Sequence, residues 1–229
     1  MKKLLLIIAL VLLSFNTYAI EIDNVIGVSG YYGSYKSTMS HTQNATIKNP
    51  DPSKPNISEF FVDSTKVSNN GYTLGLEYQA RFDKMFALGF GFQNNKINNI
   101  SFNEDSESYI YNSNNIYAVA TISPYKNKYI SVSLGVQLGV DLNKFDNQNS
   151  TNVTFSPLAD LEINLSNKIM LFSRFLYYPN DRGSFTKNVD YNTNILSKYD
   201  VVELGDLNSI NVVPNANNYD LKIGIRYKI

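Results

Sequence analysis

Apolar and polar residues alternate with a period of two along much of this 229-residue sequence. Between residues 72 and 82, for example, the even positions hold Tyr, Leu, Ala and Phe, whereas the odd positions hold Thr, Gly, Glu, Gln and Arg. A period of two is typical of β-strands whose two faces meet different surroundings. The alternation is clear in 72–82, 86–93, 130–141 and 220–229, and weaker in 25–35, 115–123, 155–165 and 169–178. The pattern therefore predicts an all-β fold with eight strands.

The segments between these strands are alternately short and long. Short segments lie near 83–85, 125–127 and 166–168, and long polar segments lie at about 36–69, 94–112, 142–153 and 179–218. Tight turns at one end and long loops at the other are typical of a closed antiparallel up-and-down transmembrane β-barrel. A ten-stranded barrel is the alternative, with the two further strands placed around 195–213.

The register of the three short hairpins follows from the requirement that an apolar face stays apolar across each turn. Hairpins centred on residues 84, 126 and 167 meet this requirement. They pair Phe82 with Phe86, Ala80 with Leu88, Ile122 with Ile130, Ala120 with Val132, Ile163 with Leu171, and Asp160 with Arg174.

Three features favour a membrane barrel over a soluble β-sandwich or a lipocalin-like barrel. The polar faces hold many glycines, which suit a narrow barrel interior where large and small residues alternate. Each apolar run covers about nine to eleven residues, the length of a tilted strand that crosses a bilayer. Aromatic residues gather near both strand ends: Phe82, Phe86, Tyr125, Tyr129 and Tyr227 at the short-turn end, and Tyr31, Tyr32, Tyr35, Tyr72, Phe92, Tyr177 and Tyr219 at the long-loop end.

The N-terminus has the pattern of a cleaved signal peptide over residues 1–19. Lys2 and Lys3 precede an apolar run from Leu4 to Leu13, and Thr17-Tyr18-Ala19 supplies a small-x-small cleavage pattern. An apolar run of this length is too short for a membrane-spanning helix, so an uncleaved anchor is the weaker alternative. We therefore expect an exported chain whose barrel occupies 20–229. The mean hydropathy of −0.22 is low because it averages the apolar outward positions of the strands with the polar residues of the lumen and loops.

The C-terminal residues follow a recognisable pattern. Lys222, Gly224, Tyr227 and Ile229 follow the order polar, x, Gly, x, x, aromatic, x, hydrophobic residue. This order resembles the assembly signal of outer-membrane β-barrels, although Ile229 stands where Phe is usual. With the strand layout, the chain resembles the small eight-stranded barrels of the OmpA/OmpX, opacity-protein and bacterial surface-antigen type. The stretch from Gly33 to His41 weakly resembles the first strand and loop of the surface antigens. The resemblance implies an outer-membrane location and recognition by the barrel-assembly machinery.

The polar face places charged residues inside the predicted barrel. Unpaired charges in such a lumen are costly, so the acids and bases are expected to pair, with Asp160 and Arg174 as direct cross-strand partners. A plugged interior is the favoured interpretation, because an eight-stranded barrel is filled by its own side chains. A selectivity lining is the alternative. The predicted lumen residues are Glu77, Arg81, Asp141, Asp160, Glu162, Arg174, Lys222 and Arg226.

The composition argues against most kinds of catalytic, metal-binding and nucleic-acid-binding site. There is no Cys, and the only His is His41, expected in the first long loop with no acid nearby in sequence, although Asp51 or Asp63 is able to approach it in space. An acidic group at Asn103–Glu107 lacks the glycine spacing of a calcium loop. The balanced charge (20 basic and 20 acidic residues) argues against nucleic-acid binding. We expect no catalytic, cofactor or metal site.

These observations predict a bacterial outer-membrane surface protein whose barrel anchors loops for adhesion, or for host or envelope contact. The expected partners are outer-membrane lipid and lipopolysaccharide, the assembly machinery, and a loop ligand that the sequence does not identify. A narrow porin-like channel is the first alternative, and a lipid-modifying enzyme is the second.

Overall fold

The computed structural model describes residues 22–82, 85–101, 108–179, 182–188 and 201–229. The predicted signal peptide and the acidic group at 103–107 lie outside these residues. Over the described ranges the chain forms ten strands, and no helix there is long and apolar enough to cross a membrane. The strands are β1 (Ile22–Ile47), β2 (Ile57–Phe82), β3 (Phe86–Ile100), β4 (Tyr109–Lys126), β5 (Ile130–Phe145), β6 (Gln148–Asn164), β7 (Ile169–Tyr177), β8 (Phe185–Asn188), β9 (Val201–Val213) and β10 (Tyr219–Lys228).

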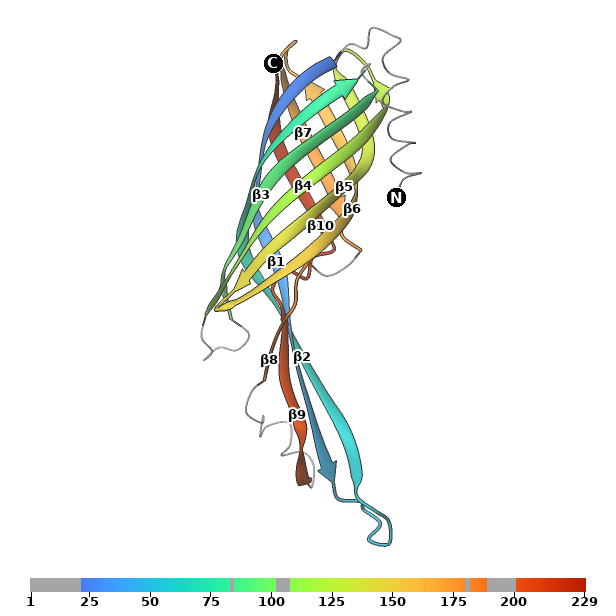
Figure 1. Cartoon of the computed structure of the whole chain (residues 1–229), viewed down its shortest axis with the longest axis vertical. Coiled ribbons are helices and arrows are strands. Elements are labelled where there is room, and N and C mark those ends of the chain that lie inside the picture. Colours follow the sequence, from blue (N-terminus) through green and yellow to red (C-terminus); the bar gives the residue numbers. More distant parts are fainter. Residues whose placement is uncertain (1–21, 83–84, 102–107, 180–181, 189–200) are drawn as a thin grey trace, which may run out of the picture.

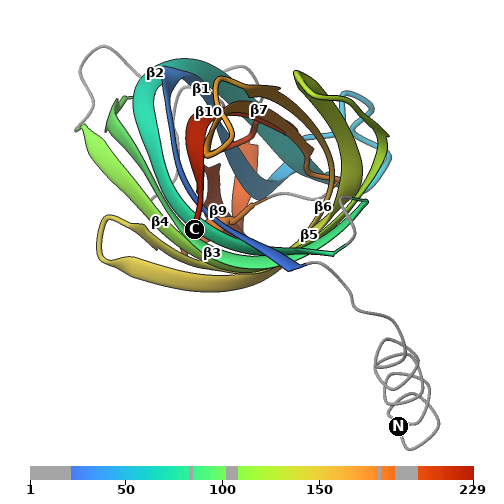
Figure 2. The ribbon, with the colours of Figure 1, turned by 90° about the horizontal axis from the view of Figure 1, so that it is seen from above.

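Eight of these strands form a closed antiparallel barrel (Figures 1 and 2). Strands β1 to β7 follow one another around the ring, β10 pairs with β7, and β10 closes the ring against β1 from Val25↔Lys228 to Gly30↔Ile223. The predicted eight-stranded barrel is therefore confirmed. β9 lies in the segment where the ten-strand alternative placed extra strands, but β8 and β9 are outside the ring.

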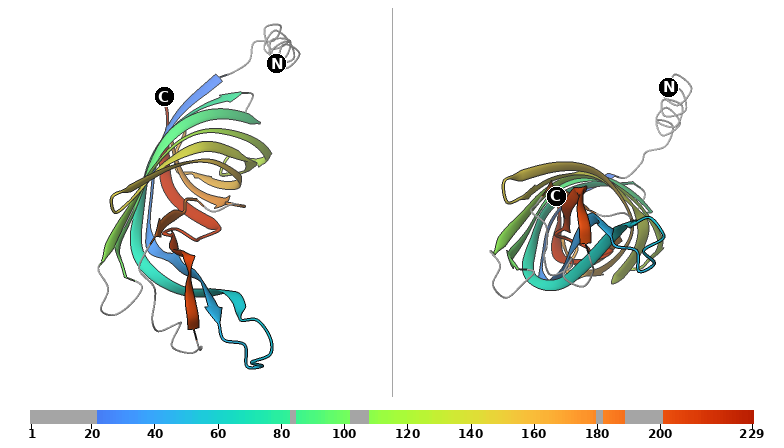
Figure 3. Two further views of the ribbon diagram at one scale, coloured as in Figure 1. Left: turned by 60° about the horizontal axis from the view of Figure 1, so that its bottom comes forward. Right: turned by 90° about the horizontal axis from the view of Figure 1, so that it is seen from below.

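A sheet protrudes from one end of the barrel, opposite the short turns (Figures 1 and 3). Beyond the barrel, β1 continues to Ile47 paired with β2, and β9 pairs with the other edge of β1 from Thr38 to Ile47. β8 extends this sheet through its pairing with β9. We call residues 38–47, 57–70, 185–188 and 201–213 the protruding sheet.

The prediction of long loops is therefore largely wrong as a description of local structure. Much of 36–69, 94–112 and 142–153 is strand, and β5 and β6 join across only Asp146 and Asn147. Asp146 has a φ of 52°, which suits so tight a turn. These extensions are rich in Asn, Ser and Thr, and their backbone pairing does not require an apolar face. The alternation rule consequently misses them.

Two of the three predicted hairpin registers are confirmed. The first hairpin pairs Phe82 with Phe86, and the third pairs Asp160 with Arg174. The second prediction is wrong, because Ile122 pairs with Leu134 rather than Ile130. Asn127 explains the difference: its side-chain oxygen accepts the backbone N–H groups of Tyr129 and Ile130, which lengthens the turn. A β-bulge lies between Ile122 and Tyr125, and beyond it the partner of Ile122 is four residues from the predicted one, an even shift that preserves the faces.

Candidate functional site

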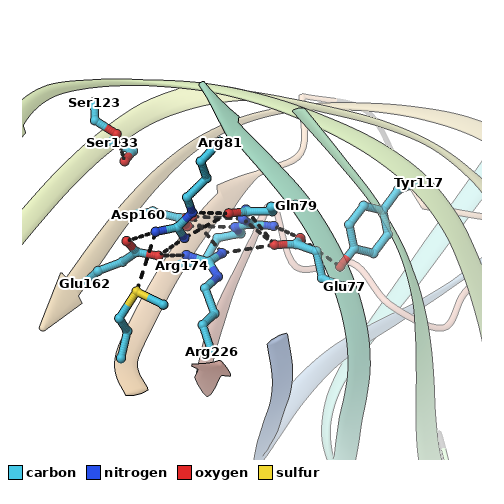
Figure 4. Close-up of polar contacts among 11 residues, drawn as sticks. Glu77, Gln79, Arg81, Tyr117, Ser123, Ser133, Asp160, Glu162, Arg174 and Arg226 are labelled. Atoms are coloured by element: carbon cyan, nitrogen blue, oxygen red, sulfur yellow. Dashed lines mark hydrogen bonds and ion pairs between the residues drawn. The ribbon is translucent and has the colours of Figure 1, made fainter. Parts of the chain in front are cut away.

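The barrel lumen holds one continuous ion cluster, which we call the lumen ion cluster (Figure 4). It comprises Glu77 and Arg81 from β2, Asp160 and Glu162 from β6, Arg174 from β7 and Arg226 from β10. Five of the six residues are at most 5% exposed. The period of two brings them together, because every second residue on these strands points inward.

Arg174 is the centre of the cluster. Its guanidinium donates two hydrogen bonds to Asp160, from Nε at 2.7 Å and from Nη2 at 2.8 Å. On its other side it donates from Nη2 to Glu77 at 3.1 Å, and it forms a second ion pair with Glu77 through Nη1. The pairing of Asp160 with Arg174 thus occurs as the hairpin register predicts. Glu77, which comes from a strand far away in sequence, is the partner that the sequence did not indicate.

Arg226 and Arg81 complete the cluster. Arg226 donates to both Glu77 and Asp160 at 3.0 Å and forms an ion pair with Glu162. Arg81 also bonds to Glu162, at 3.0 Å and 2.5 Å from its two terminal nitrogens. Three arginines therefore face three carboxylates. Charge-assisted pairs of this kind offset the cost of removing charges from water.

Aromatic rings and glycines pack around the cluster. Tyr117 donates its hydroxyl to Glu77 at 3.1 Å, and its ring lies against Gly91, where an added Cβ would be 2.5 Å from the ring. Phe172 lies against Gly224 in the same way, at 2.6 Å, and the guanidinium carbon of Arg226 stacks 3.9 Å from the centre of its ring. Inward glycines thus make room for inward aromatics, as the sequence pattern predicts for a narrow barrel.

A second group of charges lies nearer the protruding sheet. Arg182 donates to Asp220 at 2.6 Å, is 3.9 Å from Asp141, and stacks on the ring of Tyr178 at 4.1 Å. Its backbone oxygen accepts hydrogen bonds from Asn143 and Asn152. Arg182 is not among the predicted lumen residues, because it lies in a segment without strand alternation. Asp220 is not among them either, although it shares the inward face of β10 with Lys222.

Lys222 lies inside the barrel near both groups. It is 2% exposed, its ammonium is 4.9 Å from the centre of the Tyr117 ring, and no hydrogen-bond partner for Nζ is present among the described residues. All eight predicted lumen residues thus face the interior. The other motif residues are arranged as the strand period requires, since Tyr227 and Ile229 point outward with 44% and 65% exposure.

The lumen is open at the short-turn end, and the opening reaches the lumen ion cluster. A cavity of about 630 Å³ opens there and is lined by Asp23, Arg81, Glu162 and Lys228, among others. Toward the opposite end, a group of buried apolar side chains packs together, with a cavity of about 130 Å³ beside it. This group includes Tyr35, Ile97, Ile100, Tyr111, Phe145, Phe185 and Val212.

The aromatic prediction needs one correction. Tyr35 is only 1% exposed, and Tyr31 packs against the same buried group, so these two belong to the interior rather than to an outer ring. They share the inward face of β1 with Ser29. The large exposed aromatics at the two ends are Phe86, Tyr125, Tyr129 and Tyr227, and Tyr32, Phe92, Tyr177 and Tyr219.

His41 is not in a loop. It lies on β1 in the protruding sheet, is 7% exposed, and has Asp63 and Ile210 as its backbone partners on the two neighbouring strands. Asp51 instead forms the tip of the β1–β2 hairpin, where it accepts hydrogen bonds from the backbone and hydroxyl of Ser53. Of the two acids named as spatial neighbours for His41, Asp63 is the one placed opposite it.

Comparisons with known proteins found similarities of fold. No family model matches the sequence, and no curated protein matches it. The attachment invasion locus protein Ail of Yersinia pestis, solved in complex with the heparin analogue sucrose octasulfate, has a TM-score of 0.41 and 13% identity, over 91% of this chain and 99% of that chain. Neisserial surface protein A has a TM-score of 0.41 and 13% identity, over 89% and 97%. The outer membrane protease OmpT of Escherichia coli has a TM-score of 0.33 and 10% identity, over 93% and 99%.

Proposed function

We propose that this chain is an outer-membrane β-barrel that anchors the protruding sheet as a contact surface. The observation that carries the proposal is the inverted polarity of the barrel, with charges inside and apolar side chains outside. Arg174 and Arg226 are each 1% exposed, whereas Leu74, Phe90 and Ile223 are each more than half exposed.

The outward apolar side chains form a band around the whole ring. Every strand of the barrel contributes to it, including Val28, Leu76, Phe90, Ile116, Leu138, Phe155, Leu171 and Ile225. A protein surrounded by water rarely exposes so continuous an apolar surface. On β5 the band runs from Ile130 to about Val140, which suits a tilted strand crossing a hydrocarbon core about 25 Å thick. The band therefore supports a lipid-facing exterior.

The protruding sheet supports the second half of the proposal. It extends beyond the band on the side opposite the short turns, and its hairpin ends in an exposed turn at Asp51–Lys54. Residues 57–70 of β2 form an edge of the sheet that no described strand covers. Binding segments are commonly presented on a rigid scaffold in this way. The proposed contacts are adhesive, or are made with a host or envelope ligand.

The membrane anchor and its orientation are tested together. An epitope inserted at Ser53 is expected to be labelled by antibody on intact bacteria, whereas one inserted at Asn167 is expected to be labelled only after permeabilisation. Both variants, extracted in SDS, are expected to migrate faster before boiling than after, as a folded barrel does. A soluble periplasmic product without this heat-dependent shift would contradict the proposal, and equal labelling of both epitopes would contradict the orientation.

The channel alternative makes a different prediction for the same preparation. Because the lumen ion cluster spans four strands around the interior, the folded protein is expected to produce no ion conductance in planar bilayers. Each preparation is checked for heat-dependent migration, so that an inactive sample is recognised as unfolded. Reproducible conductance steps from the folded protein would replace the anchoring proposal with a channel.

The proposal assigns no reaction, cofactor or metal to the chain. We propose that outer-membrane lipid and lipopolysaccharide contact the apolar band. We also propose that the assembly machinery recognises Lys222, Gly224, Tyr227 and Ile229. A lipid-modifying activity, the remaining alternative, is tested by an assay for lipid deacylation with His41→Ala as the control.

A further inference from the structure

Lysines gather on one side of the barrel rim at the short-turn end. The stretches 124–131, 163–169 and 227–229 together contain four lysines and no aspartate or glutamate. We call Lys126, Lys128, Lys168 and Lys228 the basic arc. Lys126, Lys128 and Lys168 are exposed, and Lys228 is partly exposed.

Backbone contacts make the arc continuous. The side chain of Asn164 donates to the backbone oxygen of Lys128 at 2.9 Å, which holds the β4–β5 turn against the end of β6. The next turn follows directly from β6, and there the backbone oxygen of Lys168 accepts the N–H of Lys228 at 2.8 Å. The lysines are therefore on neighbouring elements around the rim.

Two of the ammonium groups lie beside exposed tyrosines at the short-turn end of the apolar band. Lys128 Nζ is 5.6 Å from the centre of the Tyr129 ring, and Lys168 Nζ is 5.9 Å from that of Tyr227. These tyrosines are 64% and 44% exposed. A ring with a polar tip and a neighbouring cation is the combination that is stable where hydrocarbon meets headgroups.

The nearby acids do not neutralise these two lysines. Asp23 forms an ion pair with Lys228 at 2.5 Å, and Glu162 forms ion pairs with Arg81 and Arg226 inside the lumen. Among the described residues, no ion pair joins Lys128 or Lys168 to a carboxylate. Two positive charges at the rim therefore lie beside exposed tyrosines without a carboxylate partner among the described residues.

We propose that the basic arc binds the phosphate headgroups of anionic phospholipids in the leaflet at the short-turn side. This inference rests on the proposed membrane location. Lysines close to a membrane surface attract anionic lipid, and the effect weakens with salt. A phospholipid is the expected occupant rather than a soluble anion, because the same residues that carry the charges border the apolar band.

The test measures lipid selectivity of the inserted barrel. The protein is refolded into phosphatidylcholine vesicles that contain a trace of spin-labelled phosphatidylglycerol or of spin-labelled phosphatidylcholine. The fraction of motionally restricted label gives the association of each lipid relative to the other. We expect phosphatidylglycerol to associate about threefold more strongly or better, and this preference to decline in 1 M salt.

The Lys128→Gln/Lys168→Gln double variant is expected to lose most of the preference. The matched control is Lys54→Gln/Lys66→Gln, which removes two charges from the β1–β2 hairpin beyond the barrel and is expected to retain the preference. Heat-dependent migration of each sample shows whether the barrel is inserted. The lipid-binding proposal for the basic arc is overturned if the inserted wild-type barrel shows no preference, or if the double variant retains the preference. Either outcome leaves the membrane proposal standing. Failure of the wild type to insert overturns both.

Discussion

Replacement of Arg174 by alanine is expected to lower the free energy of unfolding by about 3–5 kcal/mol. Arg174 donates three hydrogen bonds of 2.7–3.1 Å to Asp160 and Glu77, and both carboxylates are almost fully buried. Without it, three carboxylates share two arginines in a largely buried site. The measurement is a denaturant titration of the refolded protein, followed by heat-dependent gel migration.

The double variant Asp160→Ala/Arg174→Ala distinguishes the stability lost by breaking the ion pair from the stability lost by removing side-chain contacts. It leaves Glu77 and Glu162 with Arg81 and Arg226, so the cluster is again balanced. We expect it to lose less stability than either single variant. Lys54→Ala is the matched control, because its ion pair with Asp51 at 3.5 Å is exposed and such pairs contribute little to stability. Additive losses in the double variant would show that the pair is not coupled.

Substitution of Leu134 by arginine is expected to destabilise the protein in lipid by about 2–4 kcal/mol. Leu134 is 51% exposed and lies near the middle of the apolar band on β5. In a soluble protein, an exposed leucine tolerates a charge at almost no cost. In a bilayer, the same position places the guanidinium in hydrocarbon. The change in unfolding free energy in vesicles therefore distinguishes the two surroundings.

Leu142→Arg is the control for this experiment. Leu142 is on the same strand and the same face, with 45% exposure, but it is the last residue of the apolar run and lies at the edge of the band toward the protruding sheet. We expect a loss of about 0–1 kcal/mol, as at a membrane interface. Equal effects at Leu134 and Leu142 would count against a lipid-facing band.

The inward and outward faces of the strands were predictable from the sequence alone. Leu74, Leu76 and their neighbours lie outside, and Glu77 and Arg81 lie inside, because a strand has only two faces and alternation assigns each residue to one. The hairpin register was predictable where the turn is short and regular, as between Phe82 and Phe86. It failed at Asn127, since the alternation does not show how a side chain caps the turn.

The partners within the lumen were predictable only for neighbours in sequence. Asp160 and Arg174 face each other across one short hairpin, so strand register alone brings them together. Glu77 reaches Arg174 across the interior from β2 to β7, 97 residues away, and this contact depends on closure of the ring. The same holds for Arg182, which enters the interior from a segment that carries no periodic pattern.

By itself, the sequence determined the strands of the barrel, their two faces and the balance of charge on the inner face, because these depend on alternation and short turns. Tertiary structure alone decided the closure of β10 against β1, the exchange of partners among Glu77, Asp160, Arg174 and Arg226, and the extension of β1 and β2 into the protruding sheet. The physical reason is that backbone pairing and buried charges are satisfied by partners from distant strands. A polar strand above the apolar band needs such a partner, but it needs no alternating pattern.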